Sequence, residues 1–127
     1  MKVISIKQPW ASLIINGYKI YEFRTWKTKY RGKLLIHSSK TIDKKAAKRF
    51  EHLNLEYPLG KIIGEVELKD CLELNDILAK EIFDKDNNVY KNVLNHEGYA
   101  WRLENIKKYD THVTLNGKLG LWEFNEK

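Results

Sequence analysis

Lys19, Glu22 and Arg24 place two cations and one carboxylate within a short segment of the chain. The residues around them, Ile20–Trp26, are rich in aromatic side chains, which favours a β-strand, and strand alternation puts Glu22 and Arg24 on one face. Charged groups this close shift each other's pKa, so the cluster has the composition of an acid, base or nucleophile site in a pocket. The alternative is a salt bridge that only stabilises the fold.

Glu65 is a further carboxylate, inside the apolar run Ile62–Val66. Burying it costs on the order of several kcal/mol unless a cation pairs with it, so Lys19 or Arg24 is a candidate partner for Glu65 as well as for Glu22. The sequence leaves open whether the protein is an enzyme. If it is, the predicted catalytic residues are Lys19, Glu22 and Glu65.

The segment His37–Lys40 follows a predicted strand and precedes a predicted helix. Backbone N–H groups at such a junction suit a phosphate group, helped by hydroxyl and ammonium side chains. A helix-capping segment without a ligand is the alternative. The candidate ligand-binding residues here are His37, Ser38, Ser39 and Lys40. The tryptophans are core residues by default, although one of them can stack on a base.

Short strands must position these side chains. Apolar alternation and turn residues predict them at Lys2–Ile6, Ile20–Trp26, Lys33–Ser38, Lys61–Leu72, Gly98–Glu104 and Leu119–Phe124. Gly64, inside one of them, indicates a bulge or a close backbone approach.

Helices are predicted at Pro9–Asn16, after an N-cap at Thr41, and from an Asn75 cap to Phe83. The segment from Asp84 to His96 is polar and is expected to be a mobile surface loop. The chain lacks regular βαβ alternation. We therefore predict an α+β fold, a small β-barrel of five or six strands with flanking helices, in a single domain that spans residues 1–127.

The chain has 127 residues, a net charge of +6 and a pI near 9.3. This charge suits a polyanionic partner such as RNA or DNA, although lysine-rich surfaces also serve solubility. We predict that exposed cations of one turn and one helix contact a nucleic-acid backbone: Lys27, Lys29, Arg31, Lys44, Lys45 and Lys48.

Several functional classes lack their signatures. The sequence contains no phosphate-binding glycine loop and no metal-ligand spacing, and Cys71 is its single cysteine. We therefore predict no cofactor and no metal. No apolar run approaches the roughly 18 residues of a membrane span, and the first residues do not have a signal-peptide pattern, so a cytoplasmic location without membrane contact is expected.

Five sequence blocks carry a resemblance to a known family: QPWASLIINGYKIYEFRTW, RGKLLIHSSK, GKIIGEV, GYAWRLEN and GKLGLW. In this order, from about Val3 to Phe124, they resemble the ASCH domain, closest to the activating-signal-cointegrator, or thyroid-receptor-interacting coactivator, type. The resemblance implies a PUA-like barrel with a ligand cleft beside it. The cleft residues that it implies are Gly17, Lys19, Glu22 and Arg24, with Gln8, Pro9 and Trp10 as one wall and His37–Lys40 opposite.

The resemblance implies binding of RNA, DNA or a nucleotide-like ligand, with RNA as the first expectation. One branch of the family is similar to an amidohydrolase that acts on N4-acetylcytidine with a lysine, a threonine and a glutamate. The lysine corresponds to Lys19 and the glutamate to Glu65, but Glu22 stands in place of the threonine. Another branch has ribonuclease activity. A hydrolase and a protein-interaction scaffold in transcription or translation regulation are therefore the alternative functions.

Overall fold

The computed structural model describes residues 1–125, and its strands form one six-stranded sheet. The strand order is β2-β5-β4-β3-β1-β6, in which β1 and β3 are parallel and all other neighbours are antiparallel. The strands are β1 (Lys2–Gln8), β2 (Tyr21–Arg24), β3 (Gly32–Ile42), β4 (Lys61–Glu73), β5 (Tyr99–Thr114) and β6 (Leu121–Glu123). The helices are α1 (Trp10–Ile15), α2 (Lys44–Arg49) and α3 (Asp76–Lys85), with short 3-10 turns at Glu51–Leu53 and Val93–Asn95.

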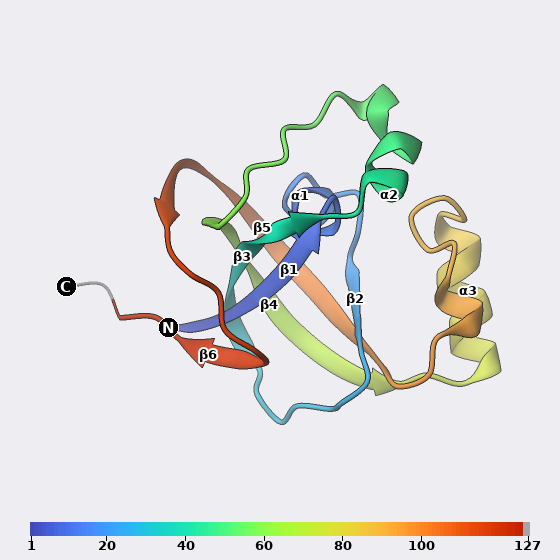
Figure 1. The fold of residues 1–127 in the computed structure, drawn as a ribbon. Coiled ribbons are helices and arrows are strands. Elements are labelled where there is room, and N and C mark those ends of the chain that lie inside the picture. Colours follow the sequence, from blue (N-terminus) through green and yellow to red (C-terminus); the bar gives the residue numbers. More distant parts are fainter. Residues whose placement is uncertain (126–127) are drawn as a thin grey trace.

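The sheet is bent but not closed. Figure 1 shows the strands crossing one another at steep angles, with α3 beside β2 and α2 following β3. The α+β class and the six strands are confirmed, whereas a closed barrel is not what the pairing shows. β2 and β6 are the sheet edges, and each pairs with one neighbour within residues 1–125. Both edge strands are short, which leaves few backbone groups with which to close a barrel.

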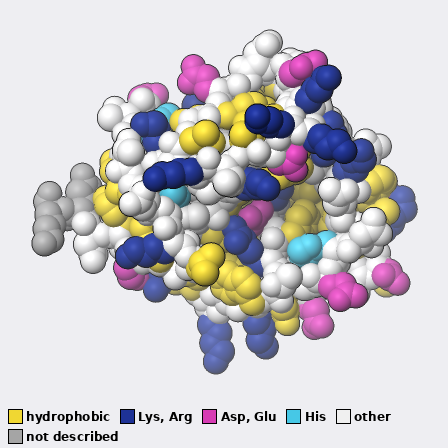
Figure 2. All heavy atoms as spheres, viewed as in Figure 1, with side chains coloured by type: hydrophobic (Ala, Val, Ile, Leu, Met, Phe, Trp, Pro, Cys, Tyr) yellow, Lys and Arg dark blue, Asp and Glu magenta, His cyan; other side chains and the backbone are white. Residues whose placement is uncertain are grey.

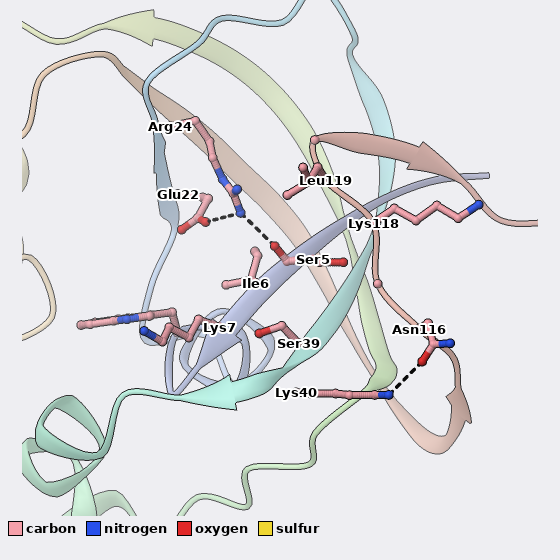
Figure 3. Close-up of a pocket in the computed structure, with 13 residues that line it drawn as sticks. Ser5, Ile6, Lys7, Glu22, Arg24, Ser39, Lys40, Asn116, Lys118 and Leu119 are labelled. Carbon is pink, nitrogen blue, oxygen red and sulfur yellow. Dashed lines mark hydrogen bonds and ion pairs between the residues drawn. The ribbon is translucent and has the colours of Figure 1, made fainter.

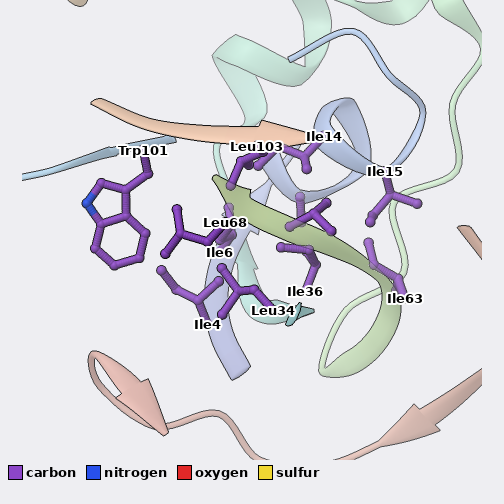
Figure 4. Close-up of a cluster of buried hydrophobic side chains, with 12 residues drawn as sticks. Ile4, Ile6, Ile14, Ile15, Leu34, Ile36, Ile63, Leu68, Trp101 and Leu103 are labelled. Carbon is purple, nitrogen blue, oxygen red and sulfur yellow. The ribbon is translucent and has the colours of Figure 1, made fainter. Parts of the chain in front are cut away.

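The main core lies between α1 and the sheet. Ile4 and Ile6 of β1 and Ile14 of α1 are almost fully buried with side chains of β3, β4 and β5 (Figure 4). Gly64 confirms the predicted close approach, because a Cβ there would lie 2.6 Å from the Lys107 carbonyl oxygen. The short helix α1 is therefore held by tertiary packing rather than by its own length.

Helix caps are predicted correctly in one case and not in another. Asn75 caps α3, since its side chain accepts a hydrogen bond from the backbone N–H of Leu78 at 2.8 Å. The expected cap at Thr41 is wrong because β3 continues through that residue to Ile42. Asp43 caps α2 instead and accepts from the backbone N–H of Ala46 at 3.0 Å.

The polar segment after α3 is not a simple surface loop. Val89, Tyr90 and Val93 are buried and form a second core cluster with α1, β2 and β5. The Tyr90 hydroxyl accepts a hydrogen bond from the backbone N–H of Ile20 at 2.9 Å. The segment therefore packs against the residues just before β2 and stabilises their position. Within residues 1–125, no helix has both the length and the apolar character needed to cross a membrane.

Candidate functional site

Lys19, Glu22 and Arg24 form one ion-pair cluster at β2. The Lys19 Nζ–Glu22 Oε1 and Arg24 Nη2–Glu22 Oε2 distances are both 3.0 Å. Lys19 Nζ also donates to the Tyr21 carbonyl and lies 4.8 Å from the centre of the Phe23 ring. Side-chain exposure is 4% for Lys19 and 12% for Glu22, so this pair is buried, while Arg24 reaches solvent more readily.

The charges of the cluster depend on one another. Burial lowers the pKa of Lys19, and the Glu22 carboxylate offsets only part of this effect. Burial alone would raise the pKa of Glu22, but the cations of Lys19 and Arg24 outweigh it and hold that pKa below its ordinary value. Both carboxylate oxygens of Glu22 are engaged in ion pairs. Glu22 therefore holds Lys19 and Arg24 in position, as in a binding site, and is not free to act as a general base.

An outer cavity of about 620 Å³ opens beside this cluster. Figure 3 shows it between β1, β2, the end of β3 and the segment that leads to β6. Arg24 Nη2 donates to the Ser5 carbonyl at 3.0 Å as well as to Glu22, and its buried Nε has no partner within residues 1–125. The lining residues are Ser5, Ile6, Lys7, Trp10, Glu22, Arg24, Ser39, Lys40, Asn116, Gly117, Lys118, Leu119 and Gly120.

The outer cavity is electropositive. Lys7, Arg24, Lys40 and Lys118 line it, and Glu22 is the one carboxylate among its lining residues in the described part of the chain. Figure 2 shows lysine and arginine side chains spread over this face, around a hollow with acidic and hydrophobic atoms. Such a surface attracts an anionic ligand.

A smaller inner cavity of about 230 Å³ shares Trp10 and Glu22 with the outer one. The Arg49 guanidinium lies 5.7 Å from the Trp10 ring centre, and the His96 ring centre lies 5.6 Å from that of Phe23. Aromatic walls with a few polar groups suit a flat, polar-edged ring. The lining residues are Trp10, Lys19, Glu22, Phe23, Arg49, Val89, Tyr90, Asn92, Val93 and His96.

His37 and Ser38 do not face either cavity. Both are fully buried. His37 Nε2 donates to the Leu115 carbonyl at 2.8 Å and Nδ1 lies 2.9 Å from Ser5 Oγ, while Ser38 Oγ donates to the Lys61 carbonyl. Neither side chain lines the outer or the inner cavity, because β3 continues past them and turns their side chains inward. Their neighbours Ser39 and Lys40 do line the outer cavity.

The three residues Gln8, Pro9 and Trp10, expected to form one wall of the cleft, also differ in whether they line a cavity. Gln8 is fully buried, and its side chain donates to Ser12 Oγ and to the Pro58 carbonyl while accepting from the Ser12 N–H. Pro9 is also buried, after a cis peptide bond. These two residues therefore have structural roles at the start of α1, and only Trp10 reaches the cavities.

Glu65 does not join the cluster. Its carboxylate accepts a hydrogen bond from the Tyr109 hydroxyl at 2.7 Å and lies 3.7 Å from Lys33 Nζ. It lines a separate cavity that contains neither Lys19 nor Glu22. The sequence-based grouping of Glu65 with Lys19 and Glu22 is therefore wrong, because the side chain at this position of β4 lies beside Lys33 of β3 and Tyr109 of β5.

The predicted backbone-contacting cations lie outside both cavities. Lys44, Lys45 and Lys48 are exposed on α2. Lys27 and Lys29 are exposed in the connection from β2 to β3, where Arg31 lies 3.5 Å from the Asp70 carboxylate. These residues remain candidates for contacts with a ligand that extends beyond the outer cavity.

Sequence reasoning missed Lys7 of β1 and the cavity residues of two further segments. Lys7 occupies the exposed position of β1 just before the Gln8–Trp10 turn, so strand alternation could have found it. Asn116–Gly120 and Asn92–His96 carry no local signal for a site. They reach the cavities only through the tertiary fold.

The segment Asn116–Gly120 depends on a close contact at Gly117. A Cβ at this position would lie 2.6 Å from Ser5 Oγ and 2.9 Å from His37 Cε1. We expect Gly117→Ala to lower the free energy of unfolding by about 1–3 kcal/mol, because the packed network behind it must shift. Urea denaturation checks this, with the exposed Lys118→Ala as a control in the same segment. Equal stability of both variants would contradict the prediction.

Solved structures with the same fold come from Zymomonas mobilis. Its ASCH protein superimposes with a TM-score of 0.55 at 15% identity, and the match covers 84% of this chain and 68% of the other. A point mutant of that protein gives a TM-score of 0.58 at 14% identity, covering 90% and 75%. At this identity the similarity concerns the fold.

Two curated relatives are both named activating signal cointegrator 1. The human protein is 35% and the mouse protein 37% identical, and each match covers 54% of this chain but 14% of the relative. The chain therefore corresponds to a small part of those proteins. The family model of the ASCH domain matches residues 4–112. Because this match spans most of the sequence, the chain belongs to the ASCH domain family.

Proposed function

We propose that this chain binds RNA through the outer cavity, with phosphate groups near Lys7, Arg24, Lys40 and Lys118. The observation that supports this most is the charge balance. Four cations line the cavity, and its carboxylate, Glu22, already has two ion-pair partners. Phosphate oxygens accept charge-assisted hydrogen bonds from lysine and especially from arginine. The ASCH family, generally associated with RNA binding, supports the same proposal.

Further cations extend the interface. In this proposal Lys44, Lys45 and Lys48 of α2 contact phosphates that leave the cavity on the side of β3. A second group in the β2–β3 connection does so on the other side: Lys27, Lys29 and Arg31. Contacts of this kind add affinity without base preference.

The inner cavity supports a nucleotide-like ligand as a variant of the same function. Trp10 and Glu22 border both cavities, so a base in the inner one can be joined to a phosphate in the outer one. The Trp10 ring and the carboxylate oxygens of Glu22 then contact the ligand. A modified nucleoside is one such ligand.

A hydrolase is less well supported. The N4-acetylcytidine amidohydrolase pattern needs Lys19 and Glu65 at one site, but Glu65 lines another cavity. The Lys19 amine already donates to Glu22 and to a backbone carbonyl. A lysine acts as a nucleophile or base only as the neutral amine. Burial lowers the pKa of Lys19 toward that form, but both groups that hold the amine belong to the protein's own packing rather than to a substrate position.

Protein partners are a separate proposal. The name activating signal cointegrator 1 belongs to much longer proteins, of which this chain matches 14%. A scaffold function would require a surface other than the outer cavity, which we assign to RNA.

RNA binding should weaken steeply with salt. Each phosphate neutralised on a single strand contributes about −0.7 to the slope of log K against log salt concentration, so the four cavity contacts alone predict a slope of about −2.8, and contacts with the outer cations make it steeper. Fluorescence anisotropy of a labelled oligouridylate octamer across a salt series measures it. An octamer of the same bases on an uncharged backbone is the control and should bind weakly.

Two results would contradict the proposed function. One is a flat salt dependence, or no binding of the octamer at low salt. The other is release of cytidine from N4-acetylcytidine by the wild type but not by Lys19→Met. The second result would replace the binding function with the hydrolase.

A further inference from the structure

The segment before β6 is fixed at its base. Leu115 makes two backbone hydrogen bonds. Its carbonyl accepts from His37 Nε2 at 2.8 Å, and its N–H donates to the Gly60 carbonyl at 3.1 Å. Asn116 Oδ1 accepts from Lys40 Nζ at 2.8 Å, and Gly117 packs on Ser5. The two residues that follow are therefore held in place at the cavity rim although their own side chains make few contacts.

Leu119 is the exposed tip of this segment. Its relative exposure is 99%, compared with 75% for Ile77 of α3 and 50% for Leu94. Single exposed apolar residues are common on protein surfaces, so exposure by itself indicates nothing. Leu119 differs in position, because it lines the outer cavity together with Lys118 and lies across from Arg24 (Figure 3).

An apolar tip among cations matches one kind of ligand. The ligand must present phosphate groups and, within a few ångströms of them, an exposed apolar face. An unpaired base of a single strand has such a face, whereas the bases of a duplex are stacked on both sides. A leucine side chain that packs on such a face removes apolar surface of both partners from water.

We propose that Leu119 packs on the face of an unpaired base, so that the outer cavity selects single-stranded nucleic acid over duplex. This inference rests on the proposed RNA binding. The phosphates on either side of that base then lie near Lys118 and Arg24, and the rigid attachment at Leu115 keeps the tip from folding away.

The test compares Leu119→Ser with Ile77→Ser, a matched apolar-to-polar change at an exposed residue that does not line the cavity. We expect Leu119→Ser to weaken binding of the oligouridylate octamer about tenfold, since the apolar surface that the base covers on the leucine is lost. The salt slope should not change, because leucine carries no charge. Ile77→Ser should bind as the wild type does.

An octamer of ribose and phosphate without bases separates the contact from the backbone. The wild type should bind the octamer with bases more tightly than the one without. In Leu119→Ser this ratio of affinities should be about tenfold smaller. The two ligands and two proteins form a double-mutant cycle that measures the coupling between Leu119 and the bases. An unchanged preference in Leu119→Ser, or equal affinity of the wild type for a duplex, would overturn the inference and leave RNA binding intact. Failure of the wild type to bind any octamer would overturn both.

Discussion

Glu22→Gln is expected to lower the free energy of unfolding by about 3–5 kcal/mol. Lys19 is 4% exposed, and its only ion-pair partner within residues 1–125 is Glu22. A glutamine keeps the shape and can still accept a hydrogen bond, but it leaves a buried ammonium group without a counter-charge. Urea denaturation of the variant measures the loss directly.

The matched control is Glu51→Gln. Glu51 is exposed and forms no ion pair in the described part of the chain, so its change should stay within about 0.5 kcal/mol. The double variant Lys19→Met/Glu22→Gln removes both charges and should be more stable than Glu22→Gln alone. A loss below about 1 kcal/mol in Glu22→Gln would contradict the prediction and would mean that Lys19 is hydrated or neutral in the variant, so that its charge needs no partner.

The same variant has a defined pH dependence. The pKa of Glu22 in the folded protein lies below its ordinary value of 4.5, so the unfolded chain binds this proton more readily. The stabilisation is complete above pH 4.5 and is lost as pH falls from there through the folded pKa. Through the Glu22 proton, the stability difference between wild type and Glu22→Gln should therefore shrink as pH falls below 4.5. A stability difference that grows in acid would contradict the lowered pKa of Glu22.

Lys7→Glu/Lys118→Glu is expected to weaken octamer binding about 100-fold at moderate salt. Both side chains are exposed and line the outer cavity from opposite segments. Losing two phosphate contacts should also make the salt slope shallower by about 1.4, at about 0.7 per contact. Anisotropy titrations across a salt series give both numbers for the variant and the wild type.

Lys85→Glu/Lys91→Glu is the charge-matched control. Lys85 and Lys91 are also exposed, but neither lines the outer or the inner cavity. If binding depends on the cavity, the control should retain most of the affinity. Equal losses in the two double variants would instead assign the binding to net charge alone.

Together these variants separate the two roles of the ion-pair cluster. Glu22→Gln tests whether the cluster stabilises the fold, and the lysine variants test binding without touching the cluster. Arg24 belongs to both roles, because its Nη2 pairs with Glu22 while the guanidinium lines the cavity. Its replacement would therefore change stability and affinity at once and is less informative.

The sequence alone determined the features that depend on near neighbours in the chain. Strand alternation placed Glu22 and Arg24 on one face, and the structure joins them in one cluster with Lys19. Asn75 caps its helix, and Gly64 allows a close approach, as predicted. The ordered motif blocks indicated the ASCH family, which the family model confirms. Each of these follows from local periodicity, capping chemistry or motif order.

Only the tertiary structure decided which distant segments meet. β1 pairs with β3 and β6, and this brings Lys7 to the same cavity as Lys118. The continuation of β3 turns His37 inward, and the packing of α3 and its following segment buries Tyr90, although both residues lie in polar stretches. Glu65 lies apart from Lys19 because a strand side chain can face either side, and only long-range pairing selects the side.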